Sequence, residues 1–261
     1  VKVIATGSSA FELSNKINEP LTGRKWEYNL YPISFAEMVG ETSLLEEKRL
    51  LSQRLIYGYY PEIVNNPGQE EELLRELSDS YLFKDLLTWE RIQKPDKLEK
   101  LVQALALQIG QLVSYHELGQ LCGLNSETVE RYIDLLEKSF IVFRLTAFSR
   151  NLRNELKKSN KIYFYDNGMR NAVINQFNSI ELRNDNGQLW ENWFVSERRK
   201  YLNNTKQKKN LHFWRTLAQQ EIDLIEVGNN KITAFECKWN QKAKGLISKS
   251  FTNAYPEAET H

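Results

Sequence analysis

The sequence predicts a multidomain α/β chain, and three patterns support this prediction. Residues 1–9 read as a β-branched strand followed by a Gly/Ser turn. From about 43 to 110, apolar residues recur at helical spacing. From about residue 187 the expected order is one helix and then three strands, at 211–215, 221–227 and 231–239. The 261 residues are enough for more than one hydrophobic core. We expect regions at 1–40, 41–110, 111–180 and 181–261.

The composition is that of an ordinary folded protein and excludes several classes. Hydrophobic residues make up 41% and charged residues 26%, and the net charge is +1, so bulk charge indicates no nucleic-acid partner. Two Cys and three His, widely spaced, form neither a disulfide framework nor a zinc motif and suit a reducing, cytoplasmic environment. No apolar run approaches about 18 residues, so no membrane span is expected.

The segment from 114 to 165 predicts a winged helix. Ser114 is placed to cap a first helix, and Gly123-Leu124-Asn125 forms a tight turn. Ser126 is then expected to cap a second helix. Strands at 140–145 and 161–165 complete the pattern of two helices followed by a two-stranded wing.

A set of carboxylates and one lysine is the strongest chemical signal. Asp223 lies on an expected strand, and Glu236 and Lys238 share one face of the next, because strand residues two apart point the same way. Glu197 lies inside the apolar stripe of the preceding helix, where a carboxylate is costly unless paired or bound to metal. Glu191 lies on the flank of that stripe and is the weaker candidate.

These residue types suit metal-assisted phosphate chemistry. Carboxylates hold Mg²⁺ or Mn²⁺ through oxygen ligands, and the metal activates water and neutralises charge on a phosphate. We therefore expect Glu197, Asp223 and Glu236 to bind metal. Asp223, Glu236 and Lys238 are the expected catalytic residues, with Lys238 orienting the water or stabilising the transition state.

The helix glutamate, Asp223 and Glu236-x-Lys238 together resemble the PD-(D/E)xK nuclease superfamily. The flanking residues resemble an uncharacterised C-terminal domain fused to a prokaryotic AAA-type ATPase. These flanking motifs lie at 189–192, 213–216, 221–223 and 236–238. The opening motifs at 5–10, 21–24 and 30–35 are similar to the same family's ATPase module.

The resemblance implies an AAA remnant, a helical lid, the winged helix and a restriction-endonuclease-like C-terminal domain, cut short at its end. It also implies that Thr6 and Ser8 lie near ATP only in the intact protein. Arg24 is expected either to reach a neighbour's nucleotide in an oligomer of the intact protein or to be an ordinary surface arginine. The sequence contains no G-x-x-x-x-G-K-[ST] motif, so ATP hydrolysis is expected to need a preceding ATPase portion. Val1 opens in mid-strand, which suggests a fragment of a longer protein.

Two basic segments predict contacts with nucleic-acid phosphates, whereas a solvated loop is the alternative for each. The candidates are Arg150, Arg153, Lys157, Lys158, Arg198, Arg199, Lys206 and Lys208. The segment that begins at Arg150 also contains Lys161 and is expected to lie in the wing. The second helix of the winged helix presents Glu127, Glu130 and Asp134 beside a single Arg131, and carboxylates repel phosphates. We expect this module to pack between domains, and the alternative is DNA contact through its wing.

Two functions remain open. In the first, the parent ATPase couples its nucleotide state to DNA engagement, with Mg²⁺-dependent cleavage at the C-terminal domain. In the second, that domain is an inactive nuclease-like module that binds a protein partner in an ATP-driven regulatory protein.

Overall fold

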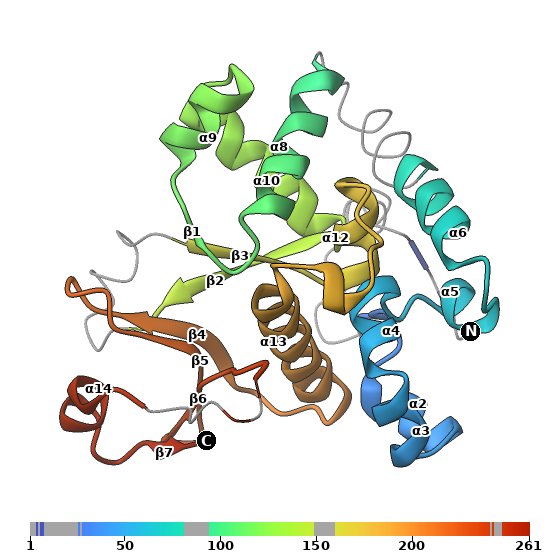
Figure 1. The fold of residues 1–261 in the computed structure, drawn as a ribbon. Helices are drawn as coiled ribbons and strands as arrows, with labels where there is room; N and C mark the ends of the chain where they lie inside the picture. The colour runs from blue at the N-terminus through green and yellow to red at the C-terminus, as the bar shows by residue number, and fades with distance from the viewer. Residues whose placement is uncertain are drawn as a thin grey trace.

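The computed structural model describes residues 4, 6–7, 26, 28–80, 94–148, 160–240, 242 and 247–261. Within these ranges it contains eleven α-helices and one mixed sheet of seven strands, which confirms the α/β class. In the view of Figure 1 most helices lie above the sheet or to its right, and the long helix α13 (Asn186–Asn204) lies between the sheet and the first helices.

Five short helices form the N-terminal part. They are α2 (Phe35–Glu41), α3 (Leu44–Arg49), α4 (Leu51–Tyr57), α5 (Pro61–Asn65) and α6 (Glu70–Leu77). Ser34 caps α2 and forms the expected capping box with Glu37, which satisfies two free backbone amides at once. The helix expected from 70 to 89 has only its first part, α6, inside the described residues.

Three helices follow, namely α8 (Pro95–Leu107), α9 (Tyr115–Cys122) and α10 (Ser126–Lys138). Ser114 caps α9 as predicted, and Gly123 ends it in the left-handed conformation with φ of 65°. The predicted cap of α10 was wrong by one position. The Asn125 side chain accepts the hydrogen bond from Thr128 N at 2.7 Å, and Ser126 is the first helical residue.

The strands are β1 (Leu112–Val113), β2 (Val142–Ala147), β3 (Asn160–Phe164), β4 (Asn210–Arg215), β5 (Glu221–Gly228), β6 (Lys231–Phe235) and β7 (Glu259–Thr260). Their order is β1-β3-β2-β4-β5-β6-β7. The β2–β4 and β6–β7 pairs are parallel, and the other neighbours are antiparallel. The hairpin of the expected winged helix and the three strands expected after residue 187 therefore belong to one sheet.

The other helices are α12 (Asn167–Val173), the 3-10 turn Ile180–Leu182, α13 (Asn186–Asn204) and α14 (Lys249–Ala254). Helix α13 is covered on two sides. On one side, Asn192 hydrogen-bonds to the backbone N and O of Phe164 in β3, at 2.8 and 3.1 Å. On the other, Trp193 packs edge-on against Phe35, with ring centroids 5.7 Å apart. The single apolar stripe read from the sequence was therefore incomplete.

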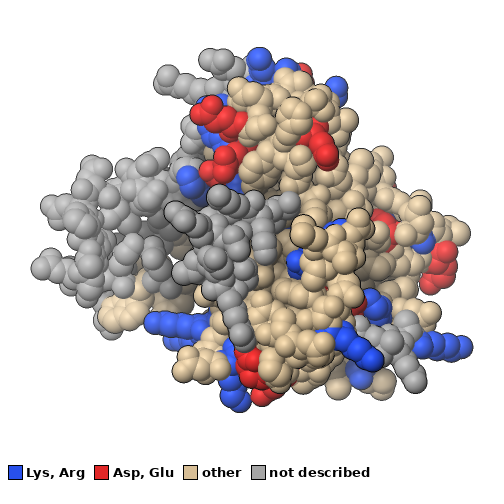
Figure 2. Space-filling view, turned by 90° about the vertical axis from the view of Figure 1, so that its left-hand side faces the viewer, with Lys and Arg blue, Asp and Glu red and all other residues tan. Residues whose placement is uncertain are grey.

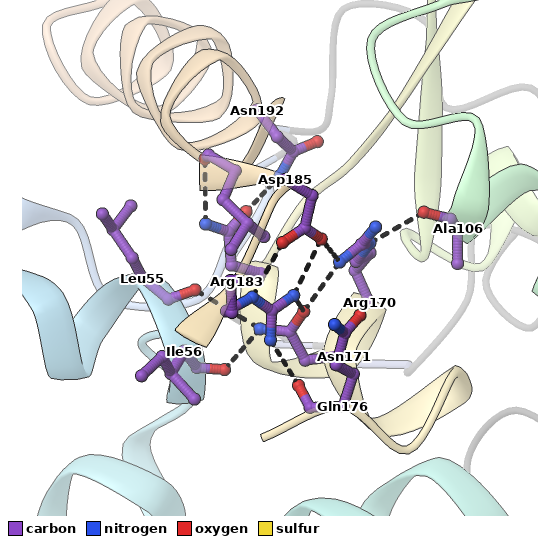
Figure 3. A network of polar contacts seen from close by, with 11 residues as sticks. Leu55, Ile56, Ala106, Arg170, Asn171, Gln176, Arg183, Asp185 and Asn192 are labelled. Atoms are coloured by element: carbon purple, nitrogen blue, oxygen red, sulfur yellow. Dashed lines mark hydrogen bonds and ion pairs between the residues drawn. The ribbon is translucent and has the colours of Figure 1, made fainter. Parts of the chain in front are cut away.

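A buried ionic network precedes α13 (Figure 3). Asp185 accepts hydrogen bonds from Arg183 at 2.8 Å and from Arg170 at 2.6 Å. Both guanidinium groups are almost fully buried. Burial alone would raise the pKa of Asp185, but the two arginines lower it below its usual value.

The same arginines tie distant elements to each other. Arg170 donates to the carbonyl of Ala106 in α8 at 2.7 Å, and Arg183 donates to Asn171 at 3.1 Å. Asn171 in turn donates to the carbonyl of Ile56 in α4 at 2.7 Å (Figure 3). The network thus joins α4, α8, α12 and the start of α13.

Helices α4 and α12 approach each other closely where two glycines lie. A Cβ atom at Gly168 would lie 2.1 Å from the carbonyl oxygen of Tyr57. Gly58 has φ of 75°, and a Cβ atom there would meet the carboxylate of Asp166. Asp166 caps α12 and accepts a 2.7 Å hydrogen bond from Tyr59 N. The Tyr57 carbonyl and the Asp166 carboxylate therefore leave no room for a side chain at either glycine.

A candidate site of carboxylates and lysines

Asp223 lies at an irregularity of β5. Ile222 pairs with Trp214 and Ile225 with His212, so Asp223 and Leu224 together stand opposite the single residue Phe213. This is a β-bulge, a feature that redirects side chains and is frequent next to functional sites. Leu224 packs in the cluster beneath α13, and Asp223 accepts a 2.7 Å hydrogen bond from the backbone N of Cys237.

Glu191 is the helix carboxylate that the structure brings to Asp223. It projects from α13 and accepts hydrogen bonds from Lys161 Nζ at 2.9 Å and from the Tyr163 hydroxyl at 2.6 Å. Burial raises the pKa of Glu191, the Lys161 ammonium opposes this rise, and the nearby Asp223 charge adds to it. The candidate judged weaker from the sequence thus lies in the site.

Lys161 lies between the carboxylates. It projects from β3 with 1% of its side chain exposed, forms ion pairs with both Glu191 and Glu221, and lies over the Phe213 ring. Glu221 also pairs with Arg215 at 2.8 Å. We call Glu191, Glu221, Asp223 and Glu236 the acid cluster.

Glu236 and Lys238 lie just beyond the end of β6, so the strand is shorter than the expected 231–239. Glu236 forms an ion pair with Lys238 through Oε1. Its other oxygen, Oε2, is buried and accepts no hydrogen bond from the residues the structure describes. Burial and the Asp223 charge raise the pKa of Glu236, and Lys238 opposes this rise. For Asp223, burial raises the pKa, and the hydrogen bond from Cys237 N and the charges of both lysines oppose it.

The structure does not bring Glu197 to this site. Six residues separate it from Glu191, which is a rotation of about 240° around the helix axis. Its carboxylate accepts a 2.8 Å hydrogen bond from Phe35 N and pairs with Lys200 Nζ at 2.7 Å. Glu197 is largely enclosed, with 13% of its side chain exposed, but its partners belong to the N-terminal segment and to its own helix. Metal binding by Glu197 together with Asp223 and Glu236 would need a different arrangement.

The acid cluster does not form a ready metal site. Among the described residues, no three His, Cys, Asp or Glu side chains are placed to hold one metal ion. One oxygen of each carboxylate is already engaged: Glu191 Oε1 by Lys161 and Tyr163, and Asp223 Oδ2 by the Cys237 amide. Oxygen donors suited to Mg²⁺ or Mn²⁺ are present, but an ammonium lies among them.

Only part of the predicted basic surface is available for phosphate contacts. Arg198 pairs with buried Glu226 at 2.6 Å, and the Arg199 guanidinium lies over the rings of Phe143 and Tyr165. Lys206 and Lys208, beyond α13, are exposed. In the face shown in Figure 2, acidic and basic side chains of the described residues are scattered among uncharged ones.

Several predicted residues lie outside the described part of the chain. They are Ser8, Arg24, Arg150, Arg153, Lys157 and Lys158. Thr6 is described and is exposed.

Two acidic residues on α10 stabilise the fold through ion pairs. Asp134 pairs with Arg144 of β2 at 2.5 Å, and Glu137 pairs with the same guanidinium at 2.8 Å. These pairs hold α10 against the sheet. Burial lowers the pKa of Arg144, but Glu137 and its other neighbours raise it overall, so the guanidinium stays charged.

Comparison with protein families and curated proteins shows which family the chain belongs to. Residues 48–180, just over half of its length, match the family described as Domain of unknown function (DUF8612). The chain belongs to this family. Residues 186–261 match Domain of unknown function (DUF4143), and residues 1–39 match an AAA domain. An AAA match together with a DUF4143 match is typical of prokaryotic AAA-ATPase-like proteins. This confirms the expected relationship to AAA-ATPase-like proteins, but not the nuclease-like fold.

The curated relatives of this DUF8612 protein are described as uncharacterized. One from Haemophilus influenzae is 27% identical over 182 residues, which cover 66% of this chain and 46% of the relative. Two from Mycobacterium bovis and Mycobacterium tuberculosis are 29% identical over 152 residues, or 58% of this chain and 33% of each relative. The chain thus spans less than half the length of these relatives. No solved structure gives a significant match. Within the described ranges, no helix has both the length and the apolar character needed to cross a bilayer.

Proposed function

We propose that the chain is the C-terminal part of an AAA-type ATPase, in which a nuclease-like unit at 186–261 acts as a binding module driven by the ATPase core. One observation carries this proposal. Lys200 donates to the carbonyl of Ile33 at 3.2 Å, and Glu197 accepts from Phe35 N at 2.8 Å. Ile33 and Phe35 lie in the segment that matches the AAA domain, whereas Glu197 and Lys200 lie in the segment that matches DUF4143.

These contacts suit the transmission of movement. Lys200 has 2% of its surface exposed and pairs with Glu197, so neither charge can lose its partner without a large desolvation cost. A nucleotide-dependent displacement of the segment around residue 33 would therefore move α13 as a rigid body. The same helix carries Glu191 of the acid cluster.

The module is proposed to bind without cleaving. The order of Glu191 on a helix, Asp223 on a bulged strand, and Glu236 and Lys238 after the next strand supports a nuclease-like character. The Lys161 ammonium, held by two of the carboxylates, favours a binding role over metal-dependent hydrolysis.

DNA is the proposed ligand of this module. Lys206 and Lys208 are exposed beside the end of α13, and exposed lysines contact phosphates without reading sequence. Binding to duplex DNA should therefore weaken steeply as salt rises, and a Lys206→Ala/Lys208→Ala variant should have a smaller salt slope, by about one unit for each lost phosphate contact. Fluorescence anisotropy with a labelled duplex measures both. A salt-independent affinity would argue against phosphate contacts.

Neither the chain nor its Asp223→Ala variant is expected to cleave DNA with Mn²⁺ or Mg²⁺. The assay uses labelled single-stranded and duplex DNA, with EDTA in a parallel reaction. Cleavage by the unsubstituted chain that is lost both in EDTA and in Asp223→Ala would overturn the proposed binding role and establish a metal-dependent nuclease. Cleavage that persists in the variant would indicate a contaminating nuclease.

Glu197→Gln tests the link between the two segments. The substitution leaves the buried Lys200 ammonium without its ionic partner, and a hydrogen bond to a charged group contributes about 1.5–3 kcal/mol. Amide hydrogen exchange at residues 33–35 should therefore accelerate by at least about tenfold. Glu181→Gln, at an exposed position, is the matched control. Unchanged exchange in Glu197→Gln would show that the segment is held by other contacts.

A further inference from the structure

The four carboxylates of the acid cluster carry more negative charge than the neighbouring cations other than Lys161 can balance. Glu191, Glu221, Asp223 and Glu236 are the four carboxylates. Arg215 pairs with Glu221 and Lys238 with Glu236, so these two cations lie at the edges of the cluster. Glu191 pairs with a further cation, whose charge also acts on Asp223.

Lys161 is that cation, and the fold delivers it from outside the nuclease-like unit. It lies on β3, paired with Leu112 of β1 on one side and Leu145 of β2 on the other. Its ammonium reaches Glu191 on α13 and Glu221 on β5, and 1% of its side chain is exposed. Tyr163, two residues along the same strand, points the same way and donates to Glu191 at 2.6 Å.

We infer that the Lys161 ammonium is a built-in counter-ion, which takes the place of a divalent metal ion in the acid cluster and keeps such ions out. The inference rests on the proposed nuclease-like character of the site. Oxygens of Glu191 and Glu221 meet at the Lys161 ammonium. Carboxylate oxygens are the ligands that Mg²⁺ and Mn²⁺ prefer, and two like cations cannot share this space without strong repulsion. The buried and unpartnered Oε2 of Glu236 is an oxygen still free to act as a ligand.

Removal of Lys161 should therefore create a divalent-cation site. The test measures the thermal midpoint Tm of the full chain in EDTA and across a Mn²⁺ titration, with no DNA present. Native protein should show no Mn²⁺-dependent change in Tm. Lys161→Met should melt at a lower temperature in EDTA and gain Tm as Mn²⁺ rises, because a ligand that binds only the folded state stabilises it. Its Mn²⁺ affinity, read by electron paramagnetic resonance of free Mn²⁺, should exceed that of native protein by at least about tenfold.

Two further variants make the result specific. Lys200→Met removes another buried lysine, one paired with the single carboxylate of Glu197. It should lose Tm without gaining a response to Mn²⁺. Adding Asp223→Asn to Lys161→Met should abolish the Mn²⁺ response. If Lys161→Met does not fold in EDTA, Lys161→Gln keeps a neutral donor to Glu191 and takes its place in the titration.

Two outcomes overturn the inference. A response of native protein to Mn²⁺ that needs Asp223 would show that metal and ammonium coexist. A loss of Tm in Lys161→Met and Lys161→Gln with no recovery in Mn²⁺ would show that Lys161 is only a structural ion pair, while the proposed binding role, which the cleavage assay tests, would stand.

Discussion

Replacing Asp185 with alanine is expected to lower the free energy of unfolding by about 3–5 kcal/mol, the usual cost of removing one partner from a buried ion pair. The substitution leaves Arg170 and Arg183 as two unpaired buried guanidinium groups, with side chains 3% and 0% exposed. It also frees the start of α13. Urea unfolding followed by circular dichroism measures the effect.

A surface pair provides the control for this prediction. Glu46→Ala removes the partner of Arg49 in a pair whose side chains are 39% and 75% exposed, and the expected change is below about 1 kcal/mol. A similar loss in both variants would show that the network in Figure 3 adds no more than a surface pair.

The contribution of Asp185 should also depend on pH. Its pKa is lowered in the folded state, so its stabilising effect is present above the unfolded value of about 3.9 and is lost as the pH falls through the folded value. The difference in stability between native protein and Asp185→Asn should therefore be constant near neutral pH and shrink below about pH 4. A difference that persists at lower pH would contradict an ionic origin.

Gly168→Ala is expected to destabilise the fold by about 3 kcal/mol or more, which is the upper part of the range for overpacking a close contact. The added Cβ would lie 2.1 Å from the Tyr57 carbonyl oxygen. Backbone atoms cannot rotate away as a side chain can, so α4 and α12 must separate. The free energy of unfolding in urea is again the measurement.

Gly187→Ala is the matched substitution, because Gly187 also lies in a helix but has nothing within 4 Å of the position of an added Cβ. Alanine has the higher helix propensity, so this variant should be unchanged or more stable by up to about 1 kcal/mol. Equal losses in both glycine variants would rule out the close contact as the cause.

Local patterns predicted the elements of the fold well and their assembly poorly. The strands at 211–215 and 221–227 and the helix start at Ser114 were readable because alternation and capping act over a few residues. The parallel pairing of β2 with β4 was not predicted. It joins residues 66 apart in sequence, Thr146 and His212, and neither segment alone specifies its neighbour.

The candidate site was predicted only in part, again because the sequence does not show which distant segments pack together. Asp223, Glu236 and Lys238 were found by strand spacing, and Asp223 and Glu236 lie together in the cluster. Choosing Glu197 over Glu191 assumed that α13 buries one face. Because α13 is enclosed by the sheet on one side and by the N-terminal segment on the other, a buried glutamate on it has two destinations, and helical periodicity cannot distinguish them.

Lys161 was read as part of a basic wing because five basic residues lie between 150 and 161. Alternation with the apolar residues of β3 was the available signal, since Lys161 and Tyr163 share a face. A lysine at such a position is buried only if acids come from elsewhere in the chain, and here Glu191 and Glu221 lie 30 and 60 positions later.

The continuity of the sheet limits how the chain can be divided. A fragment starting at residue 186 would keep β4, β5 and β6 but lose β2, and the freed side of β4 would present the backbone groups that Thr146, Ala147 and Phe148 now cover. An uncovered strand edge of this kind recruits other strands, so the fragment would tend to self-associate through β4. The boundary between the DUF8612 and DUF4143 matches is therefore a boundary in sequence only. The sheet that covers the edge of β4 includes strands from both sides of it.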